Sequence, residues 1–250
     1  MVTGENARTK MLESINKDIK AYHIDPKKEI LMGYFVFNKE NNTVTNIINT
    51  RDSFPKIFMN EIQGKTVQTS QDEKGYHIAI VNTNGEKQEI ATIKNGQLIS
   101  LTLSAKTIDD YCLEFDTGLE ELTLLGTTHI GKRFLCYNEK LHQLIAKNVE
   151  EFEPLCLRWN TGLTDLDLPN LRKARYGLLD NNKTLRHLYA PQWTDFEPPH
   201  ASIGAKGADL AAPFFKQNTH LRQKAHSEPL KERLDTATKT PWVHPLKRVH

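Results

Sequence analysis

The chain has 250 residues, enough for one large domain or two small ones, and 38% of them are hydrophobic against 26% charged. The net charge is +2, but residues 201–250 carry nine Lys and Arg against four Asp and Glu. This excess of positive charge is small, so nucleic acid or an acidic membrane surface is a disfavoured partner of the basic tail.

Three cysteines without paired spacing suit a reducing compartment and predict a cytoplasmic location. No signal-peptide core or apolar run of about 20 residues is found, so we expect no transmembrane segment.

Residues 1–94 predict a small α+β region. The spacing of Met11, Leu12, Ile15 and Ile19 favours a helix over residues 6–22. Residues 29–37 then read as a strand that pairs across a turn with residues 43–49, and residues 76–81 and 87–93 read as a second hairpin. Asn84-Gly85 suits the positive φ that such a turn needs. The region is either a separate domain or, as we favour, a cap on the end of the repeats that follow it.

Residues 95–197 repeat with a period of twenty-two residues. Each unit begins Leu-x-x-Leu-x-Leu, with Ala146 and Ala190 in the last place of two units. The Leu-x-Leu step has the period of two that places alternate side chains on one face of a strand. The later part of each unit ends in Asn or Asp, whose side chain can bond backbone groups at a tight corner. One unit cannot bury its leucines alone, so about five stacked units are predicted to share a core. Three columns hold only leucine: Leu119, Leu141, Leu163 and Leu185; Leu122, Leu144, Leu166 and Leu188; Leu113, Leu135, Leu157 and Leu179.

This pattern resembles the leucine-rich repeat family, most closely its irregular bacterial class. Units of that class run Leu-x-x-Leu-x-Leu-Pro, then Ile-Gly-x-x-x-Phe, then Cys or Asn. "LTDLDLPNL" (163–171) carries the first part and "LTLLGTTHIGKRFLCYN" (122–138) the second, whereas "AKNVEEFEPLCL" (146–157) lacks the Ile-Gly pair. The resemblance implies an α+β protein with a leucine-rich-repeat-like solenoid over residues 95–197. The alternative is an amphipathic helical repeat.

After residue 197 the leucine register stops. Residues 198–250 mix Pro, Gly and Ala and end in two proline breaks, so a basic, loosely ordered C-terminal tail is predicted.

Signatures of common enzymes are missing from the sequence. "QGKT" (63–66) lacks the glycine that a phosphate-binding loop needs at position 59, which is Met59. No G-x-S-x-G, H-E-x-x-H or C-x-x-C occurs, so no catalytic residue, metal site or cofactor is predicted. Cys136 shares a column with Glu114, Arg158 and Asp180, which predicts a solvent-facing thiol, while Cys112 and Cys156 point inward. A Cys–His nucleophile with His129 or His142 is conceivable, but no orienting third group is apparent.

The residues that flank the strand leucines point away from the core, and stacked parallel strands about 4.8 Å apart align them in rows. Exposed carboxylates beside a tyrosine favour a basic protein partner. The other interpretation is that these are ordinary solvated strand residues. The predicted partner-binding residues are Glu121, Gln143, Ile145, Asp165, Asp167, His187 and Tyr189.

We therefore expect a non-catalytic protein-binding module that uses the concave sheet of the solenoid. The family resemblance suggests a bacterial effector, secreted into a host cell without a standard signal peptide. Two alternatives stay open. One is an enzyme whose active site lies outside the repeats, with the solenoid recognising its target. The other is a structural protein that assembles through an unshielded end of the solenoid.

Overall fold

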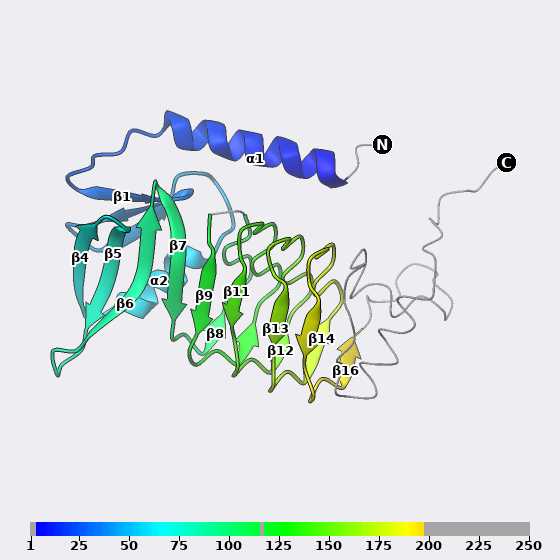
Figure 1. Ribbon diagram of the computed structural model, residues 1–250. Helices are drawn as coiled ribbons and strands as arrows, with labels where there is room; N and C mark the ends of the chain where they lie inside the picture. The colour runs from blue at the N-terminus through cyan, green and yellow to red at the C-terminus, as the bar shows by residue number, and fades with distance from the viewer. Residues whose placement is uncertain (1–3, 116–117, 198–250) are drawn as a thin grey trace.

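The computed structural model describes residues 4–115 and 118–197, which fold mostly into strands (Figure 1). Two helices occur in these residues, α1 (Gly4–Ala21) and α2 (Phe54–Ile62). Neither described helix is long and apolar enough to cross a bilayer. The tail predicted for residues 198–250 lies outside the described residues.

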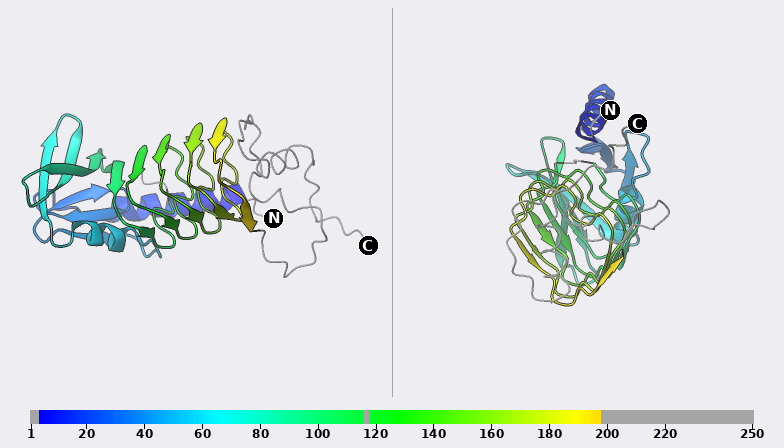
Figure 2. Two further views of the ribbon diagram at one scale, coloured as in Figure 1. Left: turned by 90° about the horizontal axis from the view of Figure 1, so that it is seen from below. Right: turned by 90° about the vertical axis from the view of Figure 1, so that its right-hand side faces the viewer.

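Helix α1 confirms the predicted N-terminal helix and runs along the length of the molecule (Figures 1 and 2). Ile15 is buried, and Met11, Leu12 and Ile19 are half-buried against the core, as their helical spacing predicts.

Helix α2 is an element that the sequence analysis missed. Phe54, Ile57 and Phe58 follow the i, i+3, i+4 pattern of a buried helix face, and all three are buried. Pro55 stands in the first turn, where its missing N–H costs no hydrogen bond. The signal for this helix was therefore present in the sequence.

A small antiparallel sheet contains β1 (Glu29–Met32), β2 (Phe35–Asn38) and β3 (Thr43–Asn46). The predicted pairing of residues 43–49 with the preceding strand is confirmed by β2 and β3. The prediction of a single strand over residues 29–37 is wrong, because the chain reverses between Met32 and Phe35. Gly33 permits the reversal, since its φ of 73° lies in the left-handed region that glycine adopts without strain.

A larger sheet begins with hairpins and continues into the repeats. It contains β4 (Thr66–Asp72), β5 (Gly75–Val81), β6 (Lys87–Lys94) and β7 (Gln97–Leu103), each antiparallel to the next. The predicted hairpin at Asn84-Gly85 is confirmed, with Gly85 at φ 82°. Strand β7 also pairs in parallel with β9 (Glu121–Leu124), so residues 66–103 and the repeats share one sheet.

The repeats form a solenoid-like stack, whose turns contribute five strands to each of two parallel rows. Figure 2 shows the rows on opposite sides of the stack. The first row is β7, β9, β11 (Gln143–Ile145), β13 (Asp165–Asp167) and β15 (His187–Tyr189). The second row is β8 (Thr107–Ile108), β10 (His129–Ile130), β12 (Glu151–Phe152), β14 (Lys173–Arg175) and β16 (Asp195–Glu197).

Strand register confirms the predicted solenoid. Leu122 pairs with Leu144 and Leu166 with Leu188, each partner twenty-two residues further along the chain. The helical-repeat alternative is wrong, because the described residues between 97 and 197 contain strands and turns and no helix. The second row of strands was not predicted.

The third side of each turn is held by an unusual backbone. Leu113, Leu135, Leu157 and Leu179 are fully buried, yet their φ angles are 54°, 54°, 55° and 63°. Such a conformation costs a non-glycine residue on the order of 1–3 kcal/mol. Burial of the leucine offsets this cost, as does a hydrogen bond to the preceding turn: the N–H of Leu135 donates to Cys112 O (3.0 Å), and that of Leu157 to Phe134 O (2.9 Å).

Buried asparagines link the same turns. Asn138 Nδ2 donates to Leu113 O (2.7 Å) and Asn160 Nδ2 to Leu135 O (2.6 Å), and both side chains have no exposed surface. The sequence-based interpretation of this column, that its amides bond backbone at the corner, is confirmed at Asn138 and Asn160.

We expect Asn160→Ala to lower the free energy of unfolding by about 1–3 kcal/mol, because it leaves the buried Leu135 carbonyl without this donor. Asn148→Ala is the matched control. Its exposed amide also bonds a carbonyl of the preceding turn, Leu125 O at 2.7 Å, but water can replace it, so we expect a loss below about 0.5 kcal/mol. Urea denaturation of both variants measures the difference. Equal losses would contradict the role assigned to the buried amide.

Candidate functional site

The predicted binding residues all lie on the outward face of the first row. Along β11, β13 and β15 the exposed, buried, exposed pattern places one leucine in the core and its two neighbours outside. The predicted rows form in pairs: Glu121 is opposite Gln143, and Asp165 is opposite His187. The residues so placed are Glu121, Gln143, Ile145, Asp165, Asp167, His187 and Tyr189.

The predicted rows are interrupted between β11 and β13. Strand β11 ends the six-stranded sheet, whereas β13 and β15 form a separate two-stranded sheet. Hydrogen-bonded strand pairing is therefore interrupted at this one step of the predicted rows. The two strands still follow one another in the stack (Figure 1).

A depression of about 610 Å³ lies over this break. Ile145 and Tyr189 line it, and they are two of the large hydrophobic side chains left exposed, at 37% and 42%. The remaining lining includes Gln143, Asp165 and Asp167. The depression thus combines apolar surface with carboxylates.

Asp165 is held in its charged form. Its Oδ2 accepts a hydrogen bond from Thr164 Oγ1 (2.6 Å), and its Oδ1 lies 2.6 Å from Nδ1 of His187. These hydrogen bonds, first that of Thr164 and then that of His187, lower the pKa of Asp165. The arrangement is not a catalytic triad, because the Thr164 hydroxyl donates to the carboxylate and not to the imidazole.

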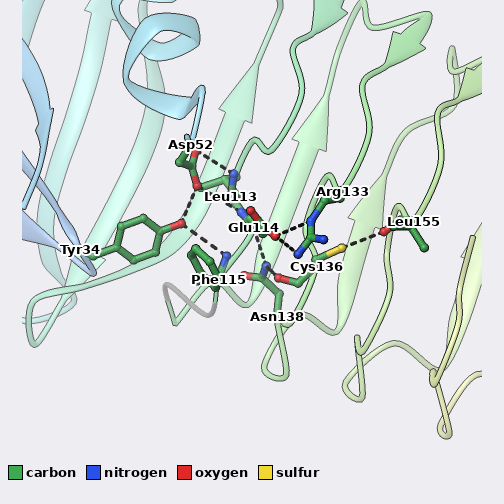
Figure 3. A network of polar contacts seen from close by, with 9 residues as sticks. All are labelled: Tyr34, Asp52, Leu113, Glu114, Phe115, Arg133, Cys136, Asn138 and Leu155. Carbon is green, nitrogen blue, oxygen red and sulfur yellow. Dashed lines mark hydrogen bonds and ion pairs between the residues drawn. The ribbon is translucent and has the colours of Figure 1, made fainter. Parts of the chain in front are cut away.

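A second candidate is a buried network where the N-terminal region meets the first turn of the stack (Figure 3). Tyr34 donates to Asp52 Oδ2 (2.5 Å). The N–H of Leu113 donates to Asp52 Oδ1 (3.1 Å), and that of Glu114 donates to Oδ2 (3.1 Å). Burial raises the pKa of Asp52 to about 6, although these hydrogen bonds oppose the rise. Asp52 is only 7% exposed, so a substrate has no direct access to it.

This network replaces a missing turn. In later turns the N–H of Leu135 or Leu157 donates to a carbonyl of the turn before it. Leu113 has no earlier turn, and its N–H donates to Asp52 instead. Neither Tyr34 nor Asp52 was predicted as a site residue, since no motif in the sequence marks them.

Cys136 is buried, so the prediction of a solvent-facing thiol is wrong. It is 1% exposed, its Sγ donates to Leu155 O (2.8 Å), and burial raises its pKa to about 12. The reason lies in its polar column: Glu114 forms an ion pair with Arg133, and Asp180 pairs with Arg158, so the column is covered. A neutral, enclosed thiol cannot act as the nucleophile considered from the sequence. Cys112 and Cys156 are buried, as predicted.

The second row carries a cluster of His129, Glu151 and Glu153, whose ligand atoms lie within 4.8 Å of one another. Glu151 already pairs with Lys173 (3.3 Å) and Glu153 with Arg175 (3.1 Å). A metal ion would have to compete with both cations for these carboxylates. The cluster is therefore best described as a ladder of ion pairs across the strands.

Comparison with models of known protein families, with curated proteins and with solved structures gives no match to this chain. The fold itself defines the class, a solenoid-like repeat protein of mostly strands. The relationship of residues 95–197 to leucine-rich repeats stays a prediction.

The raised pKa of Asp52 predicts that stability increases as the pH falls. The folded protein, with a pKa of about 6, binds a proton that the unfolded chain, with a pKa near 3.8, releases. Between pH 7 and pH 5 this group should add roughly 1 kcal/mol to the free energy of unfolding, measured by urea denaturation. Asp52→Asn should remove this part of the pH dependence.

Tyr34→Phe supplies a second test of the same group. The Tyr34 hydrogen bond lowers the pKa of Asp52, so its loss should move the rise in stability to higher pH. Superimposable pH profiles for the native protein and both variants would show that Asp52 does not titrate in this range.

Proposed function

We propose that this protein is a non-catalytic module that binds a protein partner over the depression between β11 and β15. The observation that carries the proposal is the exposure of Ile145 and Tyr189 beside Asp165 and Asp167 in one depression. Exposed apolar side chains that gather in a concavity are typical of interaction sites, and tyrosine is frequent among the residues that dominate binding.

The charge of the depression indicates a basic partner segment. Asp165 keeps its charge because Thr164 and His187 lower its pKa, and Asp167 stands on the same strand face. A Lys or Arg side chain fits this chemistry, with its aliphatic stem against Ile145 or Tyr189 and its cation at the carboxylates.

We also infer that residues 1–94 act as the cap favoured by the sequence analysis. Strand β6 pairs with the edge of β7. Asp52 accepts from Leu113 N, and Glu61 accepts from Ser104 N (2.7 Å) and Ser104 Oγ (2.7 Å). These contacts supply acceptors to the first turn, which has no earlier turn to supply them.

The enzyme alternative requires an accessible perturbed group outside the repeats. The carboxyl group whose pKa rises to about 6 there is Asp52, and it is buried and hydrogen-bonded on both oxygens. This supports a structural role for Asp52. Delivery as a bacterial effector stays a prediction from the family resemblance.

The test is affinity capture with mass spectrometry, using the native protein and Asp165→Lys/Asp167→Lys/Tyr189→Ala. We expect the variant to lose the partner, with affinity weakened by about tenfold or more, because it reverses the charge and removes the aromatic anchor.

The control is Glu13→Lys/Asp18→Lys/Tyr22→Ala, with two changes on α1 and one at the residue after it, where all three side chains are exposed. It makes the same change of charge and loses the same aromatic group, so it should keep the partner. Thermal unfolding first establishes that both variants fold. Equal capture by the native protein and the first variant would overturn the proposed site.

A further inference from the structure

Strand β4 is the outer edge of the six-stranded sheet. It pairs with β5 through seven consecutive residue pairs without a shift in register. No strand of the described residues pairs with its other edge, and β4 lies at one end of the sheet in Figure 1. Six of its seven residues are exposed. Alternate residues of such a strand direct N–H and C=O groups outward, toward any strand that approaches.

This edge lacks the usual protection against pairing. Edge strands commonly carry a central lysine, a proline or a bulge, which prevents a second strand from docking. Residues 66–71 read TVQTSQ, with no charge and no proline. Charges occur only at the two ends, Lys65 at the start and Asp72 with Glu73 at the finish.

We propose that β4 pairs antiparallel with β4 of a second copy, centred on Thr69, to form a symmetric dimer. In this register Thr69 faces Thr69 of the second copy, Thr66 faces Asp72, and Lys65 faces Glu73. Opposite charges therefore meet at both ends, and uncharged residues, all polar except Val67, meet between them. Thr–Thr pairs across strands are favourable, so the centre of the contact suits self-pairing.

The charges also select the direction of pairing. A parallel, in-register pair would set Lys65 against Lys65 and Glu73 against Glu73, which is destabilising. The antiparallel pair also satisfies the twofold symmetry of most homodimers, since the same patch serves both copies.

The dimer goes beyond the proposed function and gives it a consequence. Pairing at β4 joins the six-stranded sheets of two copies. The dimer then has two depressions, one in the solenoid of each copy. A partner with two basic segments would then bind both copies, with a gain in avidity that one copy lacks.

Sedimentation velocity of the full chain over a concentration series tests the proposal. The native protein should form a dimer. Thr69→Lys and Thr69→Glu, each alone, should raise the dimer dissociation constant by roughly tenfold, because each sets like charges directly opposite one another. Thr69 is exposed, so both variants should fold, which circular dichroism checks.

An equal mixture of Thr69→Lys and Thr69→Glu should restore the dimer, because Lys then faces Glu. Only a symmetric contact centred on residue 69 predicts this rescue. Gln88→Lys is the control, since Gln88 is exposed on β6, within the same sheet but away from its edge. It should dimerise like the native protein.

A native protein that stays monomeric over the series would overturn the proposal. A dimer that survives Thr69→Lys would overturn it as well, because the contact would then lie elsewhere. So would two weakened variants that fail to associate when mixed.

Discussion

The carboxylate of Asp52 accepts hydrogen bonds from the first turn of the solenoid, on which the later turns stack. Each later turn receives hydrogen bonds from its neighbour, because the N–H of one buried leucine donates to a carbonyl of the turn before. The first turn has no such neighbour. Asp52 supplies the missing acceptors for Leu113 and Glu114, and Glu61 does the same for Ser104. A stack of turns that cannot bury their leucines singly needs such an end.

The chemistry of the contact explains why a carboxylate stands there. Its partners are the Tyr34 hydroxyl and the N–H groups of Phe54, Leu113 and Glu114, all of which donate. An ionised carboxylate only accepts hydrogen bonds, so its two oxygens suit the four donors around them. The NH2 group of an asparagine in this place would face another hydrogen-bond donor. Burial of the charge is costly, and the raised pKa of Asp52 records that cost. The hydrogen bonds to Asp52 thus favour its charged form, whereas desolvation favours its protonated form.

Much of the stack was predictable from sequence because its order is local and periodic. The leucine columns, the Asn column and the Asn84-Gly85 turn each depend on residues within a few positions or one period. The outward residues followed from the same period, and they are exposed. Contacts between residues that do not repeat along the chain could not be predicted in this way. Tyr34 lies 18 residues from Asp52, and Asp52 lies 61 residues from Leu113. Cys136 was misplaced because the polar residues of its column form ion pairs, and the thiol beneath them is buried.

The break between β11 and β13 is the other feature that the period did not show, and it lies at the proposed binding site. The outward residues of β9 are Glu121 and Thr123, ordinary for a solvated strand. At the break the surface changes, with Ile145 on one side and Asp165 and Asp167 on the other. A repeat selected only for stacking would keep both its ladder and its surface uniform. Two departures at one place, the interrupted strand pairing and the exposed apolar and charged side chains in one depression, support the proposal that this surface is a binding site.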